Sequence, residues 1–265
     1  MQVTRPAPAN SEELEELLSR PTEGVLRTLE RVPGDIVVLG AGGKMGPTLS
    51  RMARRALDEL GRADELIAVS RFSSSESESA LRASGVRTVR CDLTDRQAVA
   101  ELPDAPNVIF MAGQKFGTSE SPTLTWVTNT VVPAIAAGRY AGSRIVAFST
   151  GNVYPLSRVH ANGPRESDPV GPVGEYATSC LGRERVLEFY ATRRRSPLAI
   201  VRLNYANDLR YGVLTDLASR IISGEPIDLS MGHVNLIWQG DANARALQCL
   251  AHVSLPPFVI NITGP

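Results

Sequence analysis

The stretch VLGAGGKMG, residues 38–46, decides the fold because it joins an apolar strand to a helix through a glycine-rich turn. Gly40, Gly43 and Gly46 stand at GxxGxxG spacing. In such a turn one glycine permits the sharp bend, another lets a pyrophosphate approach the backbone, and a third lets helix and strand pack closely. The N-terminus of the helix adds amide N–H donors. The segment predicts a dinucleotide-binding site, with a glycine-rich loop that holds no ligand as the alternative.

Outward from this turn, apolar strands alternate with helices. We predict strands at 35–40, 65–70, 86–90, 107–112, 144–150 and 198–204, and helices from Met45 and at 77–84, 95–102, 122–139 and 175–193. Strands that are short, continuously apolar and separated by helices are buried on both faces, so the sheet should be parallel. The pattern predicts an α/β protein with a Rossmann-type, doubly wound parallel sheet.

Two further segments flank the predicted Rossmann domain at 34–204. Residues 1–33 are expected to form a helical leader, in which the leucines of each helix make one apolar stripe that must cover something: Leu14, Leu17, Leu18, Leu26 and Leu29. Residues 205–265 are expected to form a small substrate-side lobe with helices at 213–223 and 240–252 and strands at 235–238 and 258–262, the last of which can instead rejoin the sheet. The Pro- and Gly-rich stretch 155–174 is typical of a binding loop, a lid or a mobile connection.

Composition narrows the class of partner. A net charge of zero and a pI of about 6.9 give no electrostatic reason to expect nucleic acid or a membrane surface, so a small molecule is the expected ligand. No apolar run reaches the roughly 20 residues that span a bilayer, and no signal peptide is apparent, so we expect a cytoplasmic protein. Three cysteines and three histidines at unrelated spacings indicate no metal site.

Arginine dominates the basic residues. Of 28 Lys and Arg residues, only Lys44 and Lys115 are lysines. Genome composition explains such a bias most simply. Both lysines nevertheless fall in loops expected to face the cofactor, and an ammonium and a guanidinium are not interchangeable at phosphates.

Several motifs together resemble the extended short-chain dehydrogenase/reductases, the NAD-dependent epimerase/dehydratase family. They are the glycine spacing, CDLTD (91–95), FSTGNVY (148–154) and YATSC (176–180), and the resemblance spans residues 35–262. The segment VIFMAGQKFG (108–117) is similar to that of the UDP-galactose 4-epimerases. NITGP (261–265) resembles a stretch after which related chains continue, which leaves open whether part of the usual lobe is missing.

The resemblance implies roles for residues around the cofactor. Asp92 and Leu93 match the pair that holds the adenine, although Asp92 can equally be a helix cap. Met111, Ala112 and Gly113 match the loop that lines the ribose, and Lys115 matches a lysine near the diphosphate. The other residues expected to contact the cofactor lie in the glycine turn, at the ends of strands and in one helix: Lys44, Met45, Ser70, Asn129 and Asn204.

The end of the second strand indicates the choice of cofactor. NAD enzymes place an acid there on the ribose 2′-hydroxyl, whereas this chain has Ser70 and Arg71. With Arg71 and Lys44 nearby, a 2′-phosphate would be attracted rather than repelled. NADP is therefore predicted, with NAD as the alternative. Arg71 can instead be an ordinary solvated arginine that contacts no ligand.

The expected catalytic residues depart from the family pattern. The resemblance assigns proton transfer to Thr150 and to the Tyr176 of a YxxxK pair, but Cys180 stands at the lysine position. A phenol has a pKa near 10, and the lysine ammonium normally helps to lower it. Cys180 supplies no charge. Lys115 and Arg183 are the candidate substitutes for this charge. On the sequence alone, we favour the interpretation that neither residue replaces the lysine.

Two functions remain open. The first is an NADP-dependent oxidoreductase or epimerase acting on a carbohydrate-like or small hydroxyl/keto substrate. The second is a weakly active or inactive NADP-binding sensor or scaffold, suggested by Cys180. A 4,6-dehydratase is disfavoured because Gly151 and Asn152 replace the acidic pair of those enzymes. By analogy, helices 122–139 and 175–193 would pair in a homodimer.

Overall fold

The computed structural model describes residues 7–115, 120–158 and 160–264. Residues 1–6 of the predicted leader, residues 116–117 of the epimerase-like segment, residue 159 of the Pro- and Gly-rich stretch and the final residue 265 lie outside this description. No helix in the described part of the chain is long and apolar enough to cross a membrane.

Within these ranges one sheet contains seven strands: β1 (Ile36–Leu39), β2 (Leu66–Ser70), β3 (Arg87–Arg90), β4 (Asn107–Phe110), β5 (Arg144–Thr150), β6 (Leu198–Leu203) and β9 (Phe258–Ile262). Their spatial order is β3-β2-β1-β4-β5-β6-β9, and every neighbouring pair is parallel. The strand at 258–262 therefore lies in the main sheet, beside β6. The predicted doubly wound parallel fold is confirmed.

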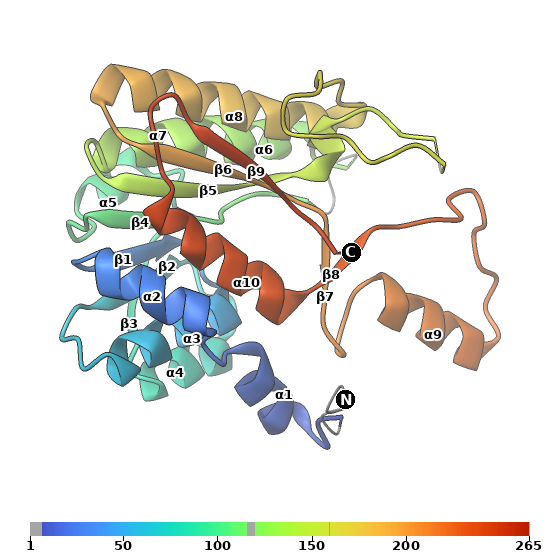
Figure 1. Ribbon diagram of the computed structural model, residues 1–265, viewed down its shortest axis with the longest axis horizontal. Coiled ribbons are helices and arrows are strands. Elements are labelled where there is room, and N and C mark those ends of the chain that lie inside the picture. Colours follow the sequence, from blue (N-terminus) through green and yellow to red (C-terminus); the bar gives the residue numbers. More distant parts are fainter. Residues whose placement is uncertain (1–6, 116–119, 159, 265) are drawn as a thin grey trace.

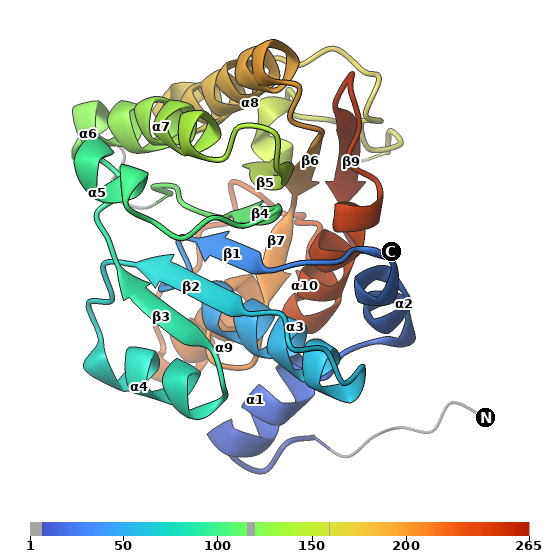
Figure 2. The same ribbon diagram turned by 90° about the vertical axis from the view of Figure 1, so that its left-hand side faces the viewer.

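Helices cover both faces of the sheet (Figures 1 and 2). One face packs against α2 (Glu23–Arg31), α3 (Gly46–Glu59) and α10 (Gln239–Gln248), with α4 (Ser75–Ala83) beside α3. The other face packs against α5 (Arg96–Ala100), α7 (Val132–Arg139) and α8 (Gly174–Arg194). Because the centres of β1, β4 and β5 are buried on both sides, each carries a continuous apolar run, at residues 36–39, 108–110 and 145–148, as the sequence pattern indicated.

The chain reverses its winding between β1 and β4, which are neighbours in space but not in sequence. Parallel strands that diverge in this way leave room at their carboxyl ends, and ligands of such sheets bind there. The glycine turn follows β1, and residues 111–115 follow β4. Both predicted cofactor loops are thus brought to this switch point.

The predicted helix 122–139 is interrupted. It consists of α6 (Pro122–Trp126), a π-helical segment η1 (Val127–Val131) and α7. Pro133 lacks an amide hydrogen and its ring crowds the carbonyl four residues earlier, that of Asn129, which accounts for the widened turn. Such π-segments are frequent at functional sites. Here the segment carries Asn129, one of the predicted site residues.

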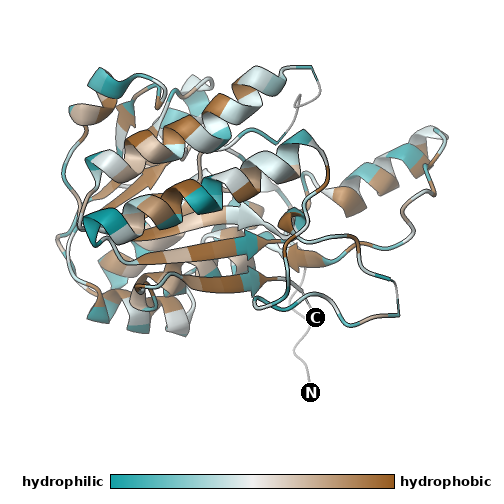
Figure 3. Cartoon of the chain, turned by 90° about the horizontal axis from the view of Figure 1, so that it is seen from above, coloured by the Kyte–Doolittle hydropathy of each residue, from teal (hydrophilic) through white to brown (hydrophobic). Residues whose placement is uncertain are grey.

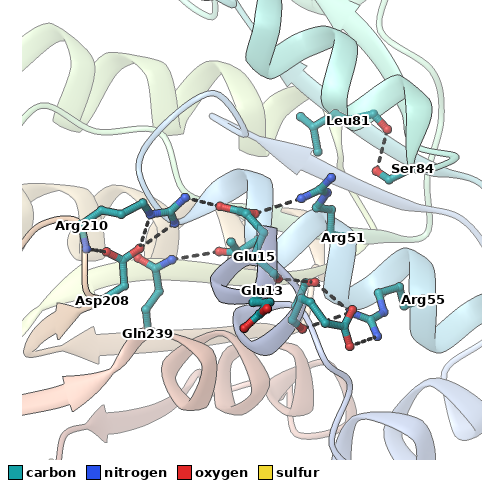
Figure 4. Close-up of polar contacts among 12 residues, drawn as sticks. Glu13, Glu15, Arg51, Arg55, Leu81, Ser84, Asp208, Arg210 and Gln239 are labelled. Atoms are coloured by element: carbon teal, nitrogen blue, oxygen red, sulfur yellow. Dashed lines mark hydrogen bonds and ion pairs between the residues drawn. The ribbon is translucent and has the colours of Figure 1, made fainter. Parts of the chain in front are cut away.

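The leader packs as two helices, α1 (Ser11–Leu18) and α2, against α3 and α10. Leu14, Leu18, Val25 and Leu29 are buried there. Polar contacts add to the packing, because Glu15 binds Arg51 of α3 at 3.1 Å and also contacts Arg210 (Figure 4).

The C-terminal lobe adds a second, two-stranded parallel sheet of β7 (Tyr205–Asn207) and β8 (Leu236–Trp238). The remaining helix of the lobe, α9 (Val213–Ser223), has no buried residue and projects away from the main sheet (Figure 3). The lobe thus overhangs the carboxyl edge of the sheet, on the side of the glycine turn (Figure 1).

Candidate functional site

Each glycine of the turn has a distinct task. Gly40 has a φ of +90°, and a Cβ there would lie 2.6 Å from the amide nitrogen of Ala112, so this glycine lets the two loops approach. A Cβ on Gly46 would collide with the carbonyl of Ala41, so this glycine lets α3 pack on the turn. A Cβ on Gly43 would meet only the Gly40 oxygen, at 3.5 Å. Because packing within the chain does not require a glycine at 43, just before the N-terminus of α3, the bare backbone there fits the close approach of a pyrophosphate.

Met45 and Lys44 complete the turn. Met45 is the residue before the first helical residue of α3 and packs against the main core. The Lys44 ammonium lies over the ring of Tyr211, 4.6 Å from its centroid, and the Tyr211 hydroxyl donates to the Lys44 carbonyl at 2.9 Å. The C-terminal lobe therefore contacts the glycine turn directly.

The predicted adenine end of the site lies at the carboxyl ends of β2 and β3. Ser70 lies against Gly42, where a Cβ would be 2.5 Å from its hydroxyl oxygen. Arg71 is exposed, and its charge helps to lower the pKa of Asp92, although hydrogen bonds from Thr94 lower it more. The Asp92 carboxylate accepts from the Thr94 amide at 2.9 Å and hydroxyl at 2.8 Å. Asp92 therefore stabilises the turn before α5 (Arg96–Ala100), whereas the helix itself is capped by Asp95, so the helix-cap alternative for Asp92 is wrong. Leu93 is buried in the core beneath.

The loop after β4 brings Lys115 toward the glycine turn. Burial lowers the pKa of Lys115, and the like charge of Lys44 lowers it further, whereas the neighbouring Cys180 raises it. The ammonium also lies over the Tyr205 ring of the lobe, 4.6 Å from its centroid. Met111 and Ala112 are half-buried and Gly113 is exposed at the start of this loop. Two ammonium groups that repel each other across a site favour an anion between them.

Thr150 and Tyr176 come together at the end of β5. Thr150 is 7% exposed, and its hydroxyl accepts from the amide of Asn152 at 3.2 Å. Burial raises the pKa of Tyr176, its neighbour Cys180 raises it further, and Arg183 and the Thr150 hydroxyl lower it. The phenol therefore remains protonated at neutral pH and can donate a hydrogen bond.

Cys180 lies one helical turn after Tyr176 and is fully buried against Val153 and Tyr154. Burial raises the pKa of its thiol, while Arg183 and Tyr176 lower it. The Asn129 amide nitrogen lies 4.0 Å from the sulfur. A buried, protonated thiol in an apolar cluster is unsuited to nucleophilic attack.

Asn129 links the π-segment to α8 and to the loop after β4. Its amide nitrogen donates to the Ser179 hydroxyl at 2.9 Å and to the Gln114 carbonyl at 3.2 Å. Its oxygen accepts from the Gln114 amide at 3.0 Å and from the guanidinium of Arg183. Asn129 thus organises the floor of the site through Ser179, Gln114 and Arg183. Of these three, the sequence had pointed only to Arg183, as a candidate substitute for the missing lysine.

A second buried polar group supports the end of β5. The Glu184 carboxylate accepts two hydrogen bonds from Arg202, at 2.8 and 3.1 Å, and one from Ser149 at 2.6 Å. Arg202 also donates to the Tyr154 hydroxyl at 2.6 Å. Although burial lowers the pKa of Arg202, its bonds to Glu184 and Tyr154 raise it above its usual range. Periodicity gave no signal for this group, because its members are far apart in sequence.

Asn204 lies at the rim of the site. Its amide donates to the Thr263 hydroxyl at 3.1 Å, and a Cβ on Gly151 would collide with its side-chain oxygen. This contact joins the end of β6 to the turn after Thr150. Among the described residues, no group of three or more His, Cys, Asp or Glu side chains could hold a metal ion.

The fold and the glycine turn at its switch point define a dinucleotide-binding α/β protein. A model of the NAD dependent epimerase/dehydratase family matches residues 36–234. The chain belongs to this family, and the resemblance inferred from its motifs is confirmed. No curated protein sequence matches the chain significantly.

Solved structures share this fold at low identity. The UDP-glucose 4-epimerase of Thermotoga maritima, solved with UDP-glucose, aligns with a TM-score of 0.69 at 19% identity over 86% of this chain and 76% of its own. The dTDP-glucose 4,6-dehydratase of Streptomyces venezuelae, solved with NAD, gives 0.73 at 18% over 86% and 75%. The UDP-glucuronic acid 4-epimerase of Bacillus cereus, in complex with UDP-glucuronic acid and NAD, gives 0.70 at 17% over 87% and 78%.

Proposed function

We propose that the protein is an NADP-dependent oxidoreductase or epimerase that acts on a hydroxyl or keto group of a sugar or sugar derivative. The observation that carries the proposal is the convergence, at one edge of the sheet, of the open backbone at Gly43 with the Thr150–Tyr176 pair. The solved relatives that bind UDP-glucose or UDP-glucuronic acid support a nucleotide-sugar substrate.

The residues of the turn would hold the cofactor. The open backbone at Gly43 and the first amides of α3 would bind the diphosphate, with Lys44 and Lys115 on either side. Arg71 would contact the 2′-phosphate and Asp92 the adenine. Bound nicotinamide supplies the acceptor or donor of a hydride.

The chain's own residues would handle the proton. Tyr176 stays protonated through neutral pH, so it would donate a hydrogen bond, and then a proton, to the carbonyl oxygen of a ketone. Thr150 would hold the same oxygen. Because an ionised phenol is needed to accept a proton from an alcohol, this arrangement favours ketone reduction over alcohol oxidation.

Absorbance of reduced nicotinamide tests this proposal. Purified protein is mixed with NADPH and a panel of keto sugars and 4-keto nucleotide sugars, with Tyr176→Phe as the control. Oxidation of NADPH by the parent but not by the control is expected. If NADPH binds but no member of the panel is turned over, the result contradicts the enzymatic function and supports the sensor or scaffold function suggested by Cys180.

We also propose that the protein forms a homodimer through α6, η1 and α8. This surface carries apolar side chains that are each more than a third exposed: Leu124, Trp126, Val127, Val131 and Phe189. Phe189 is 58% exposed. Sedimentation of the parent and of Phe189→Glu tests the proposal, since a dimeric parent and a monomeric variant are expected, and a monomeric parent would contradict it.

A further inference from the structure

Arg183 is a buried cation in the floor of the site. It is 5% exposed and lies on α8, three residues beyond Cys180. Its guanidinium donates to the Phe148 carbonyl at 2.8 Å and to the Asn129 side-chain oxygen. The Nε atom is buried without a hydrogen-bond partner. All the partners that the structure describes for this side chain are neutral.

The charge of Arg183 has no counter-ion in the described part of the chain. The adjacent carboxylate, Glu184, is engaged by Arg202 through two hydrogen bonds. A buried charge without a partner is costly, because the interior solvates it poorly. A protein that retains one therefore offers stabilisation to any negative charge that develops nearby.

The guanidinium also lies at the cofactor loop. A Cβ on Gly113 would collide with its terminal nitrogen, so the backbone of the predicted ribose loop and the guanidinium are in direct contact. The resemblance gives a lysine at position 180 the task of lowering the pKa of the tyrosine, and Cys180 stands there instead. Arg183 reaches the same loop from one helical turn further along the same helix.

We propose that Arg183 stabilises negative charge on the Tyr176 oxygen. In the resembled family, the lysine of the YxxxK pair has this role. The proposal deepens the proposed function and rests on it for its catalytic meaning. The electrostatic effect itself requires neither substrate nor cofactor. Sequence alone favoured no substitute for the lysine; the burial and neutral partners of Arg183 favour this one.

Other ionisable groups act on Tyr176 and its neighbour Cys180. The Cys180 thiol raises the pKa of the Tyr176 phenol. Glu184 raises the pKa of Cys180 and is itself paired with Arg202 at 2.8 Å. From the loop after β4, Lys115 acts on Cys180. Arg183 lowers the pKa of both Tyr176 and Cys180. This agrees with its bond to Asn129, whose amide nitrogen lies 4.0 Å from the Cys180 sulfur.

Fluorine NMR of the unliganded protein tests the proposal. Difluorotyrosine is placed at position 176, because its fluorines lower the phenol pKa toward the range in which the protein is folded. The ionisation midpoint is then compared in the parent, in Arg183→Met and in Arg185→Met. Arg185 is the matched control, since it lies on the same helix but is exposed and paired with Glu188 at 2.8 Å.

Arg183→Met should lower the acid ionisation constant of the phenol at position 176 at least about tenfold, whereas Arg185→Met should leave this constant unchanged. Adding Cys180→Lys to Arg183→Met should restore the parent midpoint by returning a cation. Equal midpoints in the parent and Arg183→Met, or a larger shift from Lys115→Met, would overturn the proposal. If Arg183→Met does not fold, Cys180→Lys is compared with the double variant: a higher midpoint in the double variant is expected, and equal midpoints overturn the proposal.

The readout separates this proposal from the proposed function. A shifted midpoint in a protein that turns over no sugar would support the role of Arg183 and contradict the proposed enzymatic function. An unshifted midpoint in an active reductase would do the reverse.

Discussion

The Glu15 carboxylate in the leader contacts the Arg210 guanidinium in the C-terminal lobe, across 195 positions of sequence (Figure 4). Arg210 is held in turn by Asp208 at 2.7 Å, and the adjacent Tyr211 reaches the glycine turn. A continuous series of polar contacts therefore joins the leader, the lobe and the start of α3. Beside these polar contacts, the buried side chains of Leu14 and Leu18 add an apolar contact.

The apolar part of this contact should dominate its contribution to stability. Leu18→Ala removes a fully buried side chain and should lower the free energy of unfolding by about 2–5 kcal/mol. Glu15→Ala removes partly exposed ion pairs and should cost at most about 1 kcal/mol. Urea titration checks both values. NADPH affinity should be unchanged in each folded variant, and a loss of affinity at unchanged stability would contradict the view that the leader makes no cofactor contact.

The glycine turn allows a matched pair of substitutions. Gly43→Ala adds a methyl group that meets only the Gly40 oxygen, at 3.5 Å, so the protein should keep its stability. It should lose at least about tenfold in NADPH affinity, because the methyl group keeps the diphosphate from the backbone. Gly46→Ala forces a collision with the Ala41 carbonyl and should destabilise the fold by more than about 1 kcal/mol. Calorimetric binding and thermal unfolding separate the two effects. Undiminished affinity in Gly43→Ala would place the diphosphate elsewhere.

Arg71 should set the preference for NADP. The protein should bind NADPH more tightly than NADH at one ionic strength. Arg71→Ala should remove about tenfold of the NADPH affinity and little of the NADH affinity, because the lost interaction is a charged hydrogen bond at an exposed position. Arg87→Ala is the control, since Arg87 is an exposed arginine on β3 whose side chain pairs with Glu65. Tighter NADH binding by the parent would refute the assignment.

Cys180→Lys should change the pH dependence of any activity. In the parent, the raised pKa of Tyr176 keeps the phenol protonated, so ketone reduction should not decline between about pH 6 and 9. A lysine ammonium beside the phenol would lower that pKa and move the alkaline limb of the rate toward neutral pH. Rate against pH for both proteins, with the same substrate, measures the shift. An unchanged profile in a folded variant would mean that Tyr176 is not the proton donor or that Arg183 already supplies the charge in full.

Local sequence pattern determined the architecture of this protein. The glycine spacing at 40–46, the apolar strands and their alternation with helices predicted the parallel, doubly wound sheet, because burial on both faces imposes a continuous apolar run on each strand. The same motifs placed the glycine turn, the end of β2 and Thr150 at one edge, since parallel strands share their carboxyl ends.

Only the tertiary structure decided how the floor of the site is built. The contacts of Arg183 with Asn129, Phe148 and the Gly113 loop join residues 35 to 70 positions apart, and no periodicity encodes such distances. From the sequence, Cys180 indicated a loss of positive charge that no other residue compensates. The sequence shows which side chain is missing at a position, but not which other side chain lies beside it in the folded protein. Burial without a counter-ion, a property of the folded chain alone, is what gives Arg183 its significance.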